Sequence, residues 1–189
     1  MQRALADGKT FVQNAKDELD RKILREDQLY FIDNQVEALD TFLADTEDVG
    51  AQSPELGAVR TELRGLKQQL ERKSMEFLAK AEGQELPEDL PPEEMAGDMA
   101  QYGAEFVTLA DEALKQKLVK VDQVGAWEDP LATINSFLAD SEPFVHLNKA
   151  LPKVRGDLKD RKRELEKRIQ DLIGAWRQAD LAGGDEDDE

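Results

Sequence analysis

The chain has 189 residues, of which 42 are Asp or Glu, 25 are Lys or Arg and none is Cys, and its formal net charge is −17. The lack of cysteine excludes disulfides, thiolate catalysis and zinc fingers, and is typical of a cytoplasmic or other reducing intracellular compartment. The negative charge argues against nucleic-acid binding, which needs a basic face. No apolar run approaches the roughly 18 residues that span a bilayer, so we expect no membrane span.

The first predicted helix covers residues 9–47. Apolar residues recur at steps of three and four from Val12 to Ile23 and again from Ile32 to Leu43, a spacing typical of an amphipathic helix. Four polar residues between the two runs are interpreted as an interruption of the apolar stripe and not as the end of the helix. At 1.5 Å per residue, such a helix would be about 60 Å long.

The second predicted helix runs from Pro54 to about Ala81. Ser53 is a competent N-cap, and proline at the next position loses no helical hydrogen bond there. Leucines at heptad spacing give this helix the clearest coiled-coil seam in the chain. Residues 83–92 follow as a loop, because three prolines in six residues cannot continue a helix.

The third predicted helix starts near Glu93 and heads toward Glu142. Pro130 removes one backbone hydrogen bond and clashes with the preceding turn, so we expect a kink or a restart capped by Asp129. Asn148 is the N-cap expected for a fourth helix, whose leucine seam continues to Trp176.

The sequence repeats itself with an offset of 95 positions. Residues 8–80 align with residues 103–175 without a gap, and 20 of the 73 pairs are identical. Helical arrays carry such repeats, because each unit needs its neighbour to bury its apolar face. We predict an all-α fold of two tandem helical-hairpin units. The predicted divisions are a first unit (1–82), a proline-rich acidic linker (83–92), a second unit (93–182) and a disordered acidic tail (183–189).

Helix lengths suggest where a partner binds. A second helix of about 28 residues covers only the last part of a 40-residue first helix, so the early apolar side chains lack an internal neighbour. The predicted partner-binding residues in this stretch are Phe11, Val12, Leu19 and Ile23.

A long helix shared between successive bundles, together with a shorter antiparallel helix, resembles the spectrin-repeat family. The acidic heptads and Trp127 near the start of a new unit are similar to that family's pattern, with residues 30–125 as one complete three-helix unit. The resemblance implies an elongated array. A four-helix bundle made of two hairpins is the alternative.

No motif in the chain carries recognisable chemistry. His146 is the only histidine and no nucleophile motif accompanies it, so we interpret it as a solvated loop residue. Glycine-rich phosphate loops and EF-hand loops are missing, and no carboxylate pair stands out from the heptads. We therefore expect a protein that is not an enzyme, with no catalytic, cofactor or metal site.

The predicted function is a scaffold, spacer or assembly subunit that acts through protein–protein contacts. The alternative is an acidic chaperone or nucleic-acid mimic that binds a basic protein, with the terminal residues Asp185, Glu186, Asp187, Asp188 and Glu189 as a second partner-binding segment. The fourth helix carries a basic run between Lys153 and Arg168. Its charges either pair along the helix or dock onto the acidic first copy, within the chain or between chains.

Overall fold

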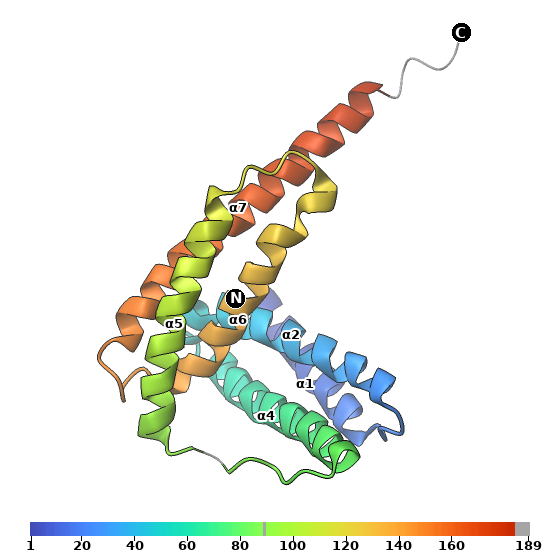
Figure 1. Ribbon diagram of the computed structural model, residues 1–189, viewed down its shortest axis with the longest axis vertical. Helices are drawn as coiled ribbons and strands as arrows, with labels where there is room; N and C mark the ends of the chain where they lie inside the picture. Colours follow the sequence, from blue (N-terminus) through green and yellow to red (C-terminus); the bar gives the residue numbers. More distant parts are fainter. Residues whose placement is uncertain (89, 184–189) are drawn as a thin grey trace. The chain divides into compact units, whose positions relative to one another are not determined.

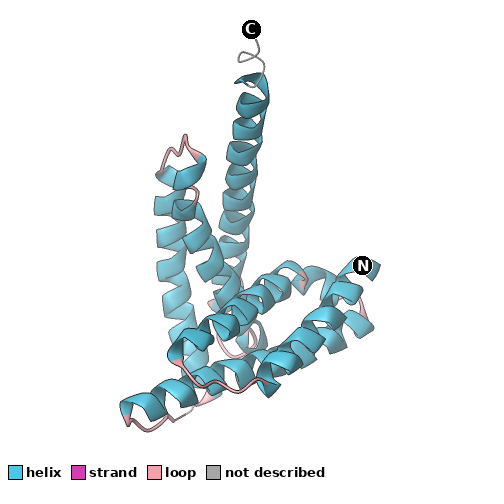
Figure 2. Ribbon diagram, turned by 90° about the vertical axis from the view of Figure 1, so that its right-hand side faces the viewer, coloured by secondary structure: helices cyan, strands magenta, loops and turns pink. Residues whose placement is uncertain are grey.

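A computed structural model describes residues 1–88 and 90–183. Over these residues the chain is all-helical, as predicted, with seven α-helices, three short 3-10 turns and no strand (Figure 2). The described residues fall into two compact units. Unit 1 holds Met1–Leu90 with Leu138–Asp140, and unit 2 holds Pro91–Phe137 and the described residues 141–183.

Unit 1 is organised around its longest helix (Figure 1). Its helices are α1 (Gln2–Asp20), α2 (Leu29–Asp45), the single turn α3 (Glu47–Gly50) and α4 (Pro54–Glu82). A 3-10 turn, Glu26–Gln28, leads into α2. Both α1 and α2 pack along α4, which makes α4 the centre of a three-helix unit.

Unit 2 contains the helices α5 (Pro92–Lys115) and α7 (Leu151–Gly183) and most of α6 (Gly125–Ser141), whose residues Leu138–Asp140 are grouped with unit 1. The 3-10 turns Val121–Gln123 and Glu142–Phe144 stand before and after α6. The helix α5 packs along α7, as α1 packs along α4 in unit 1.

The predicted continuous helix over residues 9–47 is wrong, because the chain leaves the helix at Arg21 and re-enters it at Leu29. Side chains satisfy the backbone groups that this break frees. The Gln28 side-chain oxygen accepts the N–H groups of Leu24 (2.7 Å) and Arg25 (3.1 Å). This is the glutamine half of a capping arrangement, so the polar stretch starts a new helix and does not interrupt an existing one.

The third predicted helix breaks in the same way between Lys115 and Gly125. The Gln123 side chain accepts the N–H groups of Val119 and Lys120, both at 3.3 Å. Both breaks turn the chain back, so each predicted hairpin is in fact a set of three helices. The long shared helix on which the spectrin resemblance rested is therefore not present.

Of the kink or restart expected at Pro130, the restart capped by Asp129 is wrong, since α6 runs from Gly125 to Ser141 with Pro130 inside it. Only the hydrogen bond to the carbonyl of the fourth preceding residue is lost there. The chain has already turned upstream, at residues 116–120, so no second break is needed at the proline.

The second helix begins as predicted. The Ser53 hydroxyl accepts the Leu56 N–H (3.3 Å), Pro54 occupies the first turn, and Gly83 ends the helix with a left-handed φ of 68°. Gly83 tolerates this conformation because it has no Cβ. In unit 2 the Asn148 side chain accepts the Ala150 N–H (2.8 Å) just before α7.

The core of unit 1 is a layer of leucines from α2 and α4, including Leu39, Leu43, Leu56, Leu63 and Leu70, all fully buried. The side chains predicted to lack an internal neighbour pack against this core and are partly buried: Phe11, Val12, Leu19 and Ile23. The premise of that prediction is therefore wrong. Because α1 is short and folds back along α4, its apolar face is covered within its own unit.

Two glycines, 95 positions apart in the sequence, each let neighbouring helices approach closely. A Cβ on Gly8 of α1 would lie 2.8 Å from Val59 and 2.9 Å from Phe42. A Cβ on Gly103 of α5 would lie 2.5 Å from both Val154 and Phe137. No described residue lies within 4 Å of such a Cβ on Gly97, elsewhere in α5.

We expect Gly103→Ala to lower the free energy of unfolding by about 1–3 kcal/mol through overpacking. Gly8→Ala should lower it less, because its Cβ contacts are longer. Gly97→Ala is the matched control and should raise stability by about 0.4–1 kcal/mol, since alanine favours a helix and meets open space. Urea denaturation of the full chain measures all three. If Gly103→Ala were as stable as Gly97→Ala, the close helix contact would be refuted.

Candidate functional site: two interhelical grooves

Unit 1 has a groove of about 430 Å³ between α1 and α2, here named the α1/α2 groove. Its floor is aromatic, because the rings of Phe11 and Phe42 pack with their centroids 5.1 Å apart. Exposed carboxylate residues Glu37 and Asp45 lie along α2 at its edge. The groove is lined by Phe11, Asn34, Glu37, Ala38, Thr41, Phe42 and Asp45.

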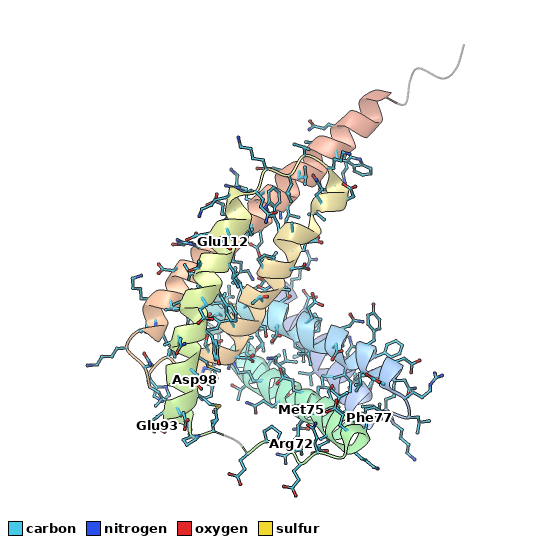
Figure 3. All side chains as sticks on the ribbon, in the orientation of Figure 1. Arg72, Met75, Phe77, Glu93, Asp98 and Glu112 are labelled. Carbon is cyan, nitrogen blue, oxygen red and sulfur yellow. The ribbon has the colours of Figure 1, made fainter. Side chains whose placement is uncertain are left out.

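Unit 2 has a groove of about 340 Å³ between α5 and α6, the α5/α6 groove. Phe106 on its floor packs edge-on against Phe137, with a centroid distance of 5.8 Å. Glu112, labelled on α5 in Figure 3, and Asp129 of α6 bring carboxylates to this groove. It is lined by Phe106, Leu109, Glu112, Ala113, Gln116, Ala126, Asp129, Pro130 and Thr133.

The two grooves share three lining positions that are 95 apart in the sequence. These are Phe11 and Phe106 on α1 and α5, and Asn34 with Asp129 and Ala38 with Thr133 on α2 and α6. The other lining residues of the two grooves are not equivalent. An apolar floor edged by carboxylates suits a large apolar side chain that has basic neighbours.

The second wall of each groove is the helix α2 or α6. A buried arginine of the central helix, α4 or α7, binds the C-terminal end of this wall. Arg60 of α4 donates to the Leu43 carbonyl (2.6 Å) and to the Thr46 hydroxyl at the end of α2. In unit 2, Arg155 of α7 donates to the Ser141 hydroxyl at the end of α6. Both arginines are almost fully buried, so these bonds are shielded from water.

A second group of charged side chains, centred on a lysine of the central helix, lies further along the same wall. Lys67, only 2% exposed, pairs at 2.9 Å with both Asp40 of α2 and Glu71, and also with Asp140 of the same compact unit. Burial lowers the pKa of Lys67, but the negative charges of Asp140, Asp40 and Glu71 together raise it above its ordinary value. The lysine is therefore held in its charged form. Burial also raises the pKa of Glu71, against the lowering effect of Lys67.

The equivalent lysine in unit 2 has a neutral buried partner. Lys162 donates to the Asn135 side-chain oxygen at 2.6 Å, and the carboxylate of Glu166 lies 3.6 Å away. Asn135 stands where unit 1 has Asp40. The geometry is thus retained while the buried charge balance differs.

The first wall of each groove, α1 or α5, is held at the C-terminal end of the helix. Lys73 of α4 donates to the carbonyls of Glu18 and Leu19, both at 2.9 Å, and to that of Arg21. In unit 2, Arg168 donates to the Leu114 carbonyl, and the Trp127 indole N–H donates to the Ala113 carbonyl (3.0 Å). Cations satisfy the free carbonyls of a helix C-terminus and favour its negative dipole end.

Of the residues predicted to bind a partner, only Phe11 lines a groove. Val12, Leu19 and Ile23 face the core of unit 1. Asp185, Glu186, Asp187, Asp188 and Glu189 lie outside the described residues. Their assignment as binding residues stays a prediction.

Sequence reasoning missed the grooves themselves. The available signal was the recurrence of the aromatic pairs, Phe11 with Phe42 and Phe106 with Phe137, at the same offset. His146 is exposed in the segment before α7. Among residues 1–88 and 90–183, no three His, Asp or Glu side chains are grouped so as to hold a metal ion. Within that same part of the chain, no helix has the length and apolarity to cross a membrane.

Comparison with protein-family models finds no match, and neither the curated proteins nor the solved structures contain a protein that matches this chain. The resemblance to spectrin repeats therefore stays a prediction. Any function has to be inferred from the geometry of the two units.

The duplicated network offers a matched test of the buried lysines. Lys67→Met should lower the free energy of unfolding by about 3–5 kcal/mol, because it breaks a buried ion pair by removing its cation. Lys162→Met should cost only about 1–3 kcal/mol, because its buried partner is a neutral amide. Chemical denaturation of the full chain measures both, and equal losses would contradict a charged Lys67 network.

The pH dependence gives this comparison a second readout. Since the folded pKa of Lys67 lies above its ordinary value of 10.5, its contribution is fully present below that pH and is lost only as the pH rises beyond it. The gap between wild type and Lys67→Met should therefore be constant from neutral pH to about pH 9. On acidification it should narrow, because protonation of the carboxylates around Lys67 removes the ion pairs that only wild type has.

Proposed function

We propose that this chain is a non-enzymatic scaffold or assembly subunit that acts through protein–protein contacts. In this proposal it consists of two copies of one three-helix unit, each offering one groove to a partner. The absence of cysteine favours a reducing intracellular compartment. The coiled-coil character of α4 and α7 still favours a distant likeness to spectrin-type repeats.

The observation that carries the proposal is the pair of grooves at equivalent positions. Each has one equivalent phenylalanine on its floor, Phe11 or Phe106, which packs against a second ring, and each has carboxylates at its edge. Unrelated surface hollows in two halves of a chain would not be expected to share lining positions at a constant offset. A repeated concave surface is typical of repeat proteins that bind other proteins.

The chemistry of the grooves favours a helical, basic and apolar partner segment. Amphipathic helices bind grooves through apolar side chains spaced by one turn. A hollow of 340–430 Å³ has room for one or two large side chains. Basic residues beside those anchors would meet the carboxylates of Glu37 and Asp45 or of Glu112 and Asp129.

A second candidate is an acidic chaperone for a basic client. It is favoured by the stretch between Arg25 and Arg60, which holds nine acidic residues and no Lys or Arg. Such a protein would bind mainly through charge, so binding would collapse at moderate salt. Binding anchored in the grooves would weaken with salt but persist.

Blocking both grooves tests the proposal. Ala38→Arg with Thr133→Arg fills one groove in each unit without replacing a core residue, and Ala58→Arg, on the exposed surface of α4, is the matched control. In affinity capture from the native source, partners held by wild type and by the control should be reduced at least about tenfold by the double variant.

Two outcomes of this capture would decide against the scaffold proposal. Equal capture by the double variant and the control would show that the grooves are not used. Capture that disappears for every variant at moderate salt would favour the acidic chaperone instead.

A further inference from the structure

The helix α5 carries two apolar seams, each with heptad spacing. The first seam consists of the small residues Ala96, Gly103 and Ala110, which are buried where α5 packs along α7. The second lies about 100° around the helix from the first, at 3.6 residues per turn, and is named the outer α5 seam here. Its side chains are larger: Met95, Met99, Tyr102, Phe106 and Leu109. Tyr102 and Leu109 are 54% and 53% exposed and the other three are partly buried, so unit 2 leaves part of this seam uncovered.

Unit 1 has polar side chains at two of the equivalent positions. Tyr102 and Leu109 correspond to Asp7 and Asn14 of α1, and both of these are exposed. Because α1 packs along α4 as α5 packs along α7, the three-helix arrangement does not need a large apolar side chain at either position. Exposed apolar residues that the fold does not require mark a surface that another molecule covers.

A row of carboxylates runs along one side of the outer α5 seam. The helix α5 contains six acidic residues and one lysine, whereas α1 contains four acidic residues and three basic ones. The row consists of Glu94, Asp98, Glu105 and Glu112, at steps of four and seven, and Asp98 and Glu112 are labelled in Figure 3. All four are exposed, and none forms an ion pair with another described residue. Charges that flank a heptad seam in this way select its partner.

We propose that the outer α5 seam binds a basic amphipathic helix of another protein. The apolar residues of that helix pack along the seam at heptad spacing, and its Lys or Arg side chains face the row of carboxylates. From Met95 to Leu109 the seam is about 21 Å long, which matches about four turns of a partner helix. Since Phe106 and Leu109 also line the α5/α6 groove, the same helix fills that groove. This inference rests on the proposed scaffold function and names the partner of unit 2.

Charge disfavours a second copy of this chain as the occupant. Two outer α5 seams placed against each other would bring their rows of carboxylates together, and like charges at an interface are unfavourable. The helix α7 is rich in basic residues, but Leu158 and Leu165 of its seam are fully buried within unit 2. A basic helix with a free apolar seam therefore has to come from a different protein.

A synthetic peptide of about three heptads tests the chemistry of the seam, with Leu at positions a and d and Lys at e and g. Its binding to the full chain is measured by titration calorimetry at several salt concentrations. Wild type should bind this peptide, and the affinity should fall as salt is raised. A matched peptide with Glu in place of every Lys should not bind.

The chain itself supplies the substitutions that test the site. Tyr102→Asp with Leu109→Asn installs the residues that unit 1 has at these positions, so the variant should unfold at the wild-type temperature. It should bind the Lys peptide about thirtyfold more weakly or less, as expected for the loss of apolar anchors. Asp98→Arg should weaken binding most at low salt. Tyr30→Asp, which replaces an exposed aromatic residue (65%) of α2, is the matched control and should bind as wild type does.

Equal binding of the Lys peptide by wild type and by the double variant would overturn the inference. Equal binding of the Glu peptide by wild type would do so as well, because the row of carboxylates would then select nothing. If wild type formed a dimer that Tyr102→Asp dissociated, the occupant would be a second copy and the inference would be wrong.

Failure of this inference can be told apart from failure of the scaffold proposal, because Tyr102 lines neither groove. If Ala38→Arg with Thr133→Arg abolished partner capture but Tyr102→Asp did not, the outer α5 seam would be refuted and the scaffold function would stand. If blocking both grooves left capture unchanged, the scaffold proposal would fail, and the peptide titration would still decide whether the seam binds a basic helix.

Discussion

Cations on the two central helices, some buried and some half-buried, are the constraint on which the rest of the structure depends. Along α4, Arg60, Lys67 and Lys73 bind the end of α2, the middle of α2 and the end of α1. Burying such charged side chains away from water is unfavourable unless every charge is compensated. Here they are compensated by carbonyls, hydroxyls and carboxylates of the two wall helices. The positions of these walls are thereby fixed, and the grooves lie between them.

Most of these cation contacts are repeated between α4 and α7, and a few features differ between the two units. Arg155, Lys162 and Arg168 repeat the contacts of α4 at the same offset, so the three-helix arrangement is common to both units. Two features differ between the units. Asp40 is replaced by Asn135 in the buried network, and α7 gains a longer, apolar end. The shared contacts maintain the three-helix arrangement, and the differences distinguish the two units.

The sequence predicted much of the fold and little of the site. Heptad leucines located α4, and Ser53 located its start, because both signals are local. The break at residues 21–25 was missed because its signal, Gln28 accepting two backbone N–H groups, looks like ordinary polar sequence. The role of Lys73 depends on a helix end more than 50 residues away in the chain, which no local pattern encodes. Phe11 was predicted to bind a partner because the start of the first helix seemed to lack a neighbour, and the packing of α1 removes that reason.

Amide hydrogen exchange of Lys73→Met, compared with wild type, tests the central claim most directly. If the lysine secures the end of α1, the amides of the last turn of α1 should exchange about ten- to a hundredfold faster, as expected for the loss of hydrogen bonds to a charged group. The last turn of α5, which Arg168 secures, should exchange at the wild-type rate. Unchanged exchange at the end of α1 would contradict the account, because its wall would then be held by apolar packing alone.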